Sequence, residues 1–190
     1  MTARMTDKPE SEPYRLEESP SHLLHRAEQL AADRFTQLVG GENVTLRQFA
    51  VLAAIAESPG LSQSDLVRAT GVDRSTMADM MTRMEKRGWV IRTASASDAR
   101  AHSVRLAPEG VTILAAATNH ARAADAAILD ALPRTKRRAF LNTLTRLARI
   151  SDEAAAKAEK DARRQAKHEA REKARRKKPP KRENARNHRA

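Results

Sequence analysis

The sequence contains no cysteine, few aromatic residues and no long apolar run. Because none of the 190 residues is cysteine, disulfides, thiolate metal sites and cysteine nucleophiles are excluded, and a reducing, cytoplasmic location is expected. Aromatic residues make up only 3% of the chain, so the core is expected to be built from aliphatic side chains, Met and Ala. No apolar run approaches the roughly 18 residues of a membrane span, and the polar residues 1–20 lack the apolar core of a signal peptide.

The positive charge is concentrated at the C-terminal end of the chain. The formal net charge is +12, but residues 157–190 contain 15 Lys and Arg against 5 Asp and Glu, a net of +10, which leaves +2 for the remainder. Net charge is therefore weak support for nucleic-acid binding by a folded domain. Such a function has to be argued from a motif.

The spacing of apolar residues predicts a mainly α-helical chain with one small β-hairpin. Residues 1–20 contain three prolines and several acidic side chains, so they are expected to be disordered. Steps of three and four residues between apolar side chains predict helices at 21–38, 46–57, 62–70, 74–87, 109–132 and 134–150. The period changes at 89–93 and 102–106, and these two segments are expected to pair as strands.

The boundaries of the central helices carry recognisable end signals. Thr45 followed three residues later by Gln48 is a capping box, and Asp73 is a favourable N-cap. Gly71 suits the left-handed conformation that ends a helix. Two short helices joined by this glycine-containing turn, and followed by a hairpin, predict a winged helix-turn-helix over residues 46–107.

The second helix of this pair is expected to enter the major groove of DNA. Its methionines recur at helical spacing, and a methionine stripe is far more often core than a ligand pocket. The opposite face is therefore left for DNA contacts, and its residues are Arg74, Ser75, Thr76, Asp79, Thr82 and Arg83.

The residue types suggest different roles on DNA. Arg74 is suited to a bidentate contact with guanine, and Ser75 or Thr76 to a base or phosphate, although both are equally typical of a helix cap. The helix N-terminus itself favours phosphate. Ser62 and Gln63, at the start of the preceding helix, are expected near the DNA backbone.

The hairpin tip contains a second candidate contact. Arg100 is expected to reach the minor groove or a phosphate, and Asp98 is placed to orient it through a carboxylate–guanidinium pair. The alternative is that Arg100 is simply a solvated hairpin side chain.

The segment from Leu46 to Gly110 resembles the MarR (multiple antibiotic resistance regulator) family. The resemblance is carried by VDRSTMADMMTRMEKRGWVIR, by Asp98-Ala99-Arg100 as the family's Asp-x-Arg wing motif, and by VRLAPEG, in which Ala107 replaces the family's usual Thr. It covers roughly residues 21–150.

This resemblance implies an obligate homodimer that binds double-stranded DNA. The helices at 21–38, 109–132 and 134–150 would form the dimerisation layer, and their broad apolar faces independently call for a partner. Two recognition helices related by a two-fold axis would read a pseudopalindrome with half-sites about one helical turn apart. Family members usually repress transcription and often release DNA when a small phenolic or acyl ligand binds between the dimer layer and the wing domain. His22, His25 and Arg26 are candidates for binding a carboxylate ligand, the alternative being that they are solvated.

The basic tail, residues 151–190, supports a competing function. Ser151 is expected to cap a separate, solvated helix that ends before Pro179, with a disordered remainder. Its charge suits either a DNA-binding arm or a solubilising tail, and a non-specific architectural DNA- or RNA-binding protein is therefore the alternative to a sequence-specific regulator. An enzyme is disfavoured, because paired carboxylates beside a nucleophile, a glycine-rich phosphate loop and metal-ligand spacing are all missing from the sequence, and no cofactor is expected.

Overall fold

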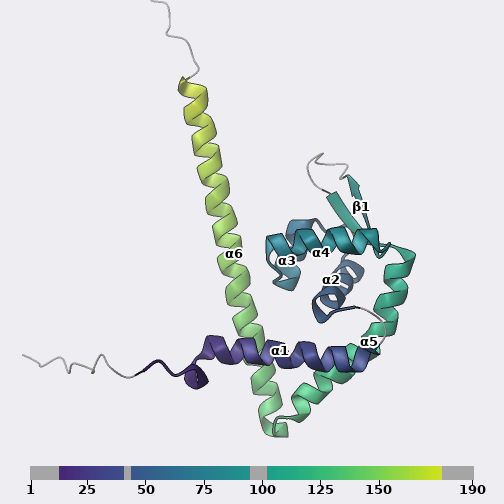
Figure 1. Ribbon diagram of the computed structural model, residues 1–190. Helices are drawn as coiled ribbons and strands as arrows, with labels where there is room; N and C mark the ends of the chain where they lie inside the picture. Colours follow the sequence, from purple (N-terminus) through teal and green to yellow (C-terminus); the bar gives the residue numbers. More distant parts are fainter. Residues whose placement is uncertain (1–12, 41–43, 95–101, 177–190) are drawn as a thin grey trace, which may run out of the picture. The chain divides into compact units, whose positions relative to one another are not determined.

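The computed structural model of the chain describes residues 13–40, 44–94 and 102–176 (Figure 1). They divide into two compact units, one ending at Arg134 and the other starting at Thr135. The first unit contains, in chain order, η1 (Leu16–Glu18), α1 (Pro20–Val39), α2 (Leu46–Glu57), α3 (Gln63–Thr70), α4 (Arg74–Lys86), β1 (Val90–Ala94), β2 (His102–Leu106) and α5 (Pro108–Asp130). The second consists of α6, whose bounds are Arg134–Arg176. This is the predicted class: mainly α with a small antiparallel hairpin.

The start of α1 corrects the expectation of disorder up to residue 20. Ser19 is the N-cap of α1 and is buried, Pro20 occupies the first helical turn, and η1 precedes them. The Tyr14 hydroxyl donates a hydrogen bond of 2.7 Å to Ser19 Oγ. Prolines, which suggested disorder, here serve as a helix starter, because the missing N–H of a proline costs nothing in the first turn. Residues 1–12 lie outside the described part.

The helix ends of the helix-turn-helix follow their local signals. The capping box of Thr45 and Gln48 is confirmed. Ser62 turns out to be the N-cap of α3 rather than its first helical residue, and it forms a second capping box with Asp65. Gly71 ends α3 in the left-handed conformation, with φ of 69°. These local bonds fix where α2 and α3 begin and end.

The hairpin pairs with the turn between α2 and α3 as well as with itself. β1 and β2 are antiparallel, with Val90 opposite Leu106. The Gly60 amide donates to the Val104 carbonyl at 2.9 Å, and the Val104 amide donates to the Leu61 carbonyl, also at 2.9 Å. The wing is therefore fastened to the start of α3 by backbone hydrogen bonds.

A single core joins α1, the helix-turn-helix, the hairpin and α5. It is aliphatic and rich in methionine, as the scarcity of aromatic residues predicts. Its aromatic members include Phe35 of α1, which is fully buried with its ring centroid 5.5 Å from that of Phe49 in α2. In Figure 1, α1 also crosses α5, the helix with which it makes its most extensive contacts.

The N-terminus of α5 packs unusually closely against the end of the reading head. Ala107 is the N-cap and supplies no side-chain hydrogen bond. Its amide donates to the Trp89 carbonyl at 3.0 Å, and Gly110 approaches the same carbonyl so closely that a Cβ would overlap it. This glycine is therefore required by a close approach of two backbone segments.

The helix α6 is continuous, and the expected break at Ser151 is absent. The sequence from 134 to 176 has neither glycine nor proline, and alanine is frequent after Glu153. Ser151 and Asp152 are tolerated inside the helix because each costs only a fraction of a kcal/mol relative to alanine, about 0.5–0.7. Among the described residues, no helix combines the length and apolarity needed to cross a membrane.

Candidate nucleic-acid interface

The helix α4 has one apolar face and one polar face, as predicted. Its four methionines are buried in the core: Met77, Met80, Met81 and Met84. Arg74, Ser75, Asp79, Thr82 and Arg83 are exposed, and Thr76 is half-buried. The predicted recognition face therefore exists as an exposed surface.

The exposed polar residues of α4 differ in what else they bind. The charged side chains Arg74, Asp79 and Arg83 form no hydrogen bond or ion pair with any residue that the structure describes. In contrast, the Ser75 hydroxyl donates to Asp73 Oδ1 at 2.6 Å, and the Thr82 hydroxyl donates to the Ala78 carbonyl at 3.0 Å. The charged residues are thus the side chains of this face that remain unpaired.

The N-terminus of α4 is occupied by a carboxylate. Asp73 Oδ1 accepts from the Thr76 amide at 2.9 Å. The hydrogen bonds from the Ser75 hydroxyl and then from Thr76 hold the pKa of Asp73 well below its usual range. The capping interpretation of Ser75 and Thr76 therefore applies. A phosphate at this helix end, which the sequence suggested, would meet a negative charge.

Ser62 and Gln63 lie at the start of α3 and are half-buried. The Ser62 hydroxyl donates to Asp65 Oδ2 at 2.6 Å and accepts from the Asp65 amide at 3.2 Å. The bonds to Ser62, assisted by the nearby Arg68, lower the pKa of Asp65. The hydroxyl of Ser62 is thus used to start the helix, whereas Gln63 makes no printed contact that would hold it.

The wing residues Asp98 and Arg100 lie outside the described residues. The strand that leads to them is tied to α4 by an ion pair, in which Arg92 Nε donates to Glu85 Oε2 at 2.9 Å. This bond raises the pKa of the Arg92 guanidinium. Sequence reasoning missed the pair, because no sequence signal links a residue near the end of a helix to one on the following strand.

Two hollows adjoin α1. The first has a volume of about 560 Å³ and contains His22 and Arg26 among its lining residues, together with Arg15, Leu16, Glu17 and Leu23. His25 is exposed and does not line it. The predicted trio is therefore only partly brought together.

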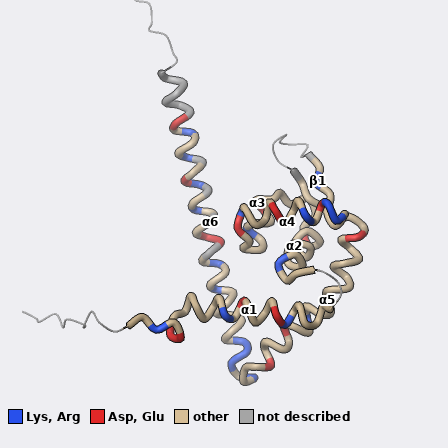
Figure 2. Tube along the Cα trace, viewed as in Figure 1, with Lys and Arg blue, Asp and Glu red and all other residues tan. Residues whose placement is uncertain are grey.

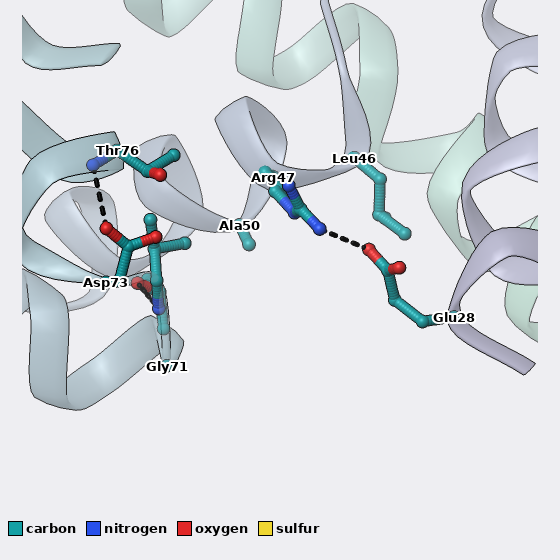
Figure 3. Close-up of a pocket in the computed structure, with 9 residues that line it drawn as sticks. Glu28, Leu46, Arg47, Ala50, Gly71, Asp73 and Thr76 are labelled. Carbon is teal, nitrogen blue, oxygen red and sulfur yellow. Dashed lines mark hydrogen bonds and ion pairs between the residues drawn. The ribbon is translucent and has the colours of Figure 1, made fainter. Parts of the chain in front are cut away.

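The second hollow has a volume of about 460 Å³ and lies between α1 and the helix-turn-helix. Figure 3 shows Glu28 of α1 and Arg47 of α2 facing one another on one side, joined at 2.8 Å, with Asp73 and Thr76 on the other side. The sequence gave no signal for this pocket, since its lining comes from four separate segments: Glu28, Leu46 to Ala50, Thr70 to Asp73, and Thr76.

Comparison with known proteins identifies the family. The MarR family model matches residues 42–101. The transcriptional regulator HosA of Escherichia coli is 35% identical over 105 residues, which cover 55% of this chain and 78% of HosA. The chain belongs to the MarR family. The resemblance seen in the sequence is confirmed, and the MarR relatives are transcriptional regulators rather than enzymes.

Solved structures of MarR-type regulators share the fold. Bordetella bronchiseptica BpsR, whose DNA binding is regulated by 6-hydroxynicotinic acid, matches with a TM-score of 0.66 and 26% identity over 72% of this chain and 98% of BpsR. The repressor CouR bound to a 23-mer DNA duplex matches with a TM-score of 0.63 and 30% identity over 73% of this chain and 99% of CouR. The chain is thus a DNA-binding transcriptional regulator with a winged helix.

Proposed function

We propose that this MarR-family chain is a homodimeric repressor that binds a pseudopalindromic operator and is released by a small-molecule effector. The observation that carries the DNA-binding part is the polar face of α4, where Arg74, Asp79 and Arg83 are exposed and unpaired within the described residues. A surface of this kind above a buried methionine face suits major-groove contact. CouR, a similar protein, has been solved on duplex DNA.

The domain organisation of this proposal follows the exposed apolar residues. Residues 46–107 form the reading head, and α1, α5 and residues 134–150 of α6 form the dimerisation layer. On α1 the exposed leucines are Leu23, Leu24, Leu30 and Leu38, with exposed fractions from 40% to 51%. On α6 they are Leu141, Leu144 and Leu147, joined by Ile150, with fractions from 38% to 54%. A second copy of the chain would remove this apolar surface from water.

The pocket between α1 and the helix-turn-helix is the proposed effector site. Its volume, about 460 Å³, lies within the usual range for small-ligand pockets, about 300–1,000 Å³. Arg47 offers a cation for a carboxylate, which would compete with Glu28 for the 2.8 Å ion pair seen in Figure 3. Because Asp73 and Thr76 belong to the start of α4, a ligand here touches both α1 and the recognition helix.

The DNA-binding part is tested by fluorescence anisotropy with the protein's own promoter fragment and a random duplex of equal length. Replacing Arg74 with Ala removes one base contact and is expected to weaken promoter binding by about 5- to 150-fold, equivalent to 1–3 kcal/mol. Arg100→Ala is expected to weaken it as well while the dimer survives. Arg122→Ala, an exposed change of equal charge on α5, is the control. Equal affinity of all three variants and the wild type would contradict the proposal.

The dimer is tested by sedimentation of two variants of α6. Leu144→Glu places a charge on the apolar stripe and is expected to shift the protein towards monomer. Asn142→Glu introduces the same charge at an exposed polar position two residues away and is expected to remain dimeric. A monomeric wild type, or a dimeric Leu144→Glu variant, would argue against this interface.

The effector site is tested with 6-hydroxynicotinic acid and 4-hydroxybenzoate as probes. Each probe that displaces the wild type from its promoter fragment is then applied to Arg47→Ala, for which displacement is expected to need a much higher concentration. Arg34→Ala, an exposed arginine of α1 outside the pocket, should respond like the wild type. Unchanged displacement of the Arg47 variant would remove this pocket as the site.

A further inference from the structure

Beyond Ile150, α6 continues as a helix to Arg176 with nothing packed on it in the described part of its unit. All of the described side chains between Asp152 and Glu169 are exposed. A helix of this kind, without an apolar face beyond alanine, gains nothing from burial. Its surface chemistry therefore decides what it can bind.

The basic residues of this extension share one face. Lys157, Lys160, Arg164 and Lys167 follow one another at steps of three, four and three residues, which places them on the same side of an α-helix. We call these four residues the basic stripe. The sequence continues it at steps of four with Arg171 and Arg175. Asp161 and Glu169 are turned away from the preceding stripe residue by about 100° and 200°. Figure 2 shows this succession of basic positions along α6.

The stripe is not neutralised by its own helix. The sequence suggested that Glu153 and Lys157 pair at i, i+4, but they do not form an ion pair in the structure, and no residue of the stripe pairs with a described carboxylate. The four cations are therefore available to an external anion.

The geometry of the stripe fits an anion with regularly repeated charges. Steps of three and four residues separate its cations by about 4.5–6 Å along the axis, and the whole stripe spans about 15 Å. Duplex DNA carries one negative charge for about every 1.7 Å of its axis. The segment 151–176 has no Phe, Tyr or Trp on which unpaired bases would stack, and no large apolar side chain after Ile150 to enter a lipid interface.

We propose that the basic stripe of α6 binds the phosphate backbone of duplex DNA as a second, sequence-independent contact in addition to the reading head. This inference rests on the proposed function, because it assumes that the protein binds duplex DNA. The stripe raises the affinity for every duplex by the same factor and leaves the choice of operator to α4. Each phosphate it neutralises steepens the dependence of log affinity on log salt by about 0.9.

The test uses the full chain and two variants. In the neutral variant, K157Q, K160Q, R164Q and K167Q remove the stripe and keep residues of good helix propensity. In the permuted variant, each cation exchanges places with the residue that follows it: K157A/A158K, K160D/D161K, R164Q/Q165R and K167H/H168K. The permuted chain keeps its composition and net charge, but its cations are turned off the stripe by about 100°. It therefore separates a contact made by one face from a general effect of charge.

Anisotropy titrations use the promoter fragment and a random duplex between 0.1 and 0.4 M salt. Both variants are expected to lose about ten- to hundredfold in affinity for both duplexes at 0.2 M salt, with salt slopes shallower by about 2 to 4 per chain and an unchanged ratio between duplexes. Wild-type affinity of either variant, or a loss restricted to the promoter fragment, would overturn the inference. So would a larger loss on an RNA hairpin or on anionic phosphatidylserine vesicles, which would identify a different partner. A wild type without preference for its promoter fragment would instead contradict the proposed function.

Discussion

Replacing Gly110 with Ala tests the close approach between α5 and Trp89. In an exposed helix interior this change stabilises a protein by about 1 kcal/mol, because alanine has the higher helix propensity. Here a Cβ would overlap the Trp89 carbonyl oxygen and lie 2.9 Å from the carbonyl carbon. Both atoms are backbone, so no side chain can rotate away, and the segment itself has to move.

That movement removes a defined interaction. The Trp89 carbonyl accepts the 3.0 Å hydrogen bond from the Ala107 amide, which is worth about 1 kcal/mol. Overpacking of a dense region costs about a further 1–3 kcal/mol, so the variant is expected to be less stable by about 2–4 kcal/mol. For a chain of this size the melting temperature should fall by roughly 5–15 °C.

Thermal unfolding followed by circular dichroism at 222 nm measures this change. Thr112→Ala, at an exposed position of the same helix, is the control and should melt close to the wild type. An equal or higher melting temperature for Gly110→Ala would show that the junction yields freely and that the steric reasoning is wrong.

Three further changes probe other parts of the fold. Asp73→Asn keeps an N-cap but cannot ionise; since the Ser75 hydroxyl and Thr76 lower the pKa of Asp73, its stabilisation is complete above about pH 4 and lost below, so the melting temperature of the variant should fall less between pH 7 and pH 3 than that of the wild type. Ala107→Ser supplies the side-chain cap that α5 lacks and should raise stability by about 1 kcal/mol in urea unfolding. Phe35→Ala empties a fully buried site and should cost about 3–5 kcal/mol in the same assay.

The sequence was most informative where a feature depends on residues close together in the chain. The capping boxes, the Asp73 cap and the methionine face of α4 each involve positions within about two helical turns, so their spacing alone was sufficient. The expectation for Ser151 failed for the opposite reason: a good capping residue starts a helix only where the preceding helix stops, and nothing before Ser151 stops α6.

Features that join distant segments were not predictable in the same way. The ion pair of Glu85 with Arg92 and the pocket at Arg47 depend on how elements pack after they form. At the recognition face, residue types suggested contacts for Ser75 and Thr82, but the structure shows that both hydroxyls already donate to partners on α4 or its cap. A polar side chain on an exposed face is therefore a weaker indication of DNA contact than an unpaired charged one.

The backbone hydrogen bonds between Val104 and the turn at Gly60 and Leu61 have a dynamic consequence. An isolated two-stranded hairpin is only marginally stable in water, and here it borrows a third strand from the turn that starts α3. The wing cannot open without also breaking these bonds. The amide hydrogens of Gly60 and Val104 should therefore exchange with solvent together, so that wing and turn behave as a single cooperative unit.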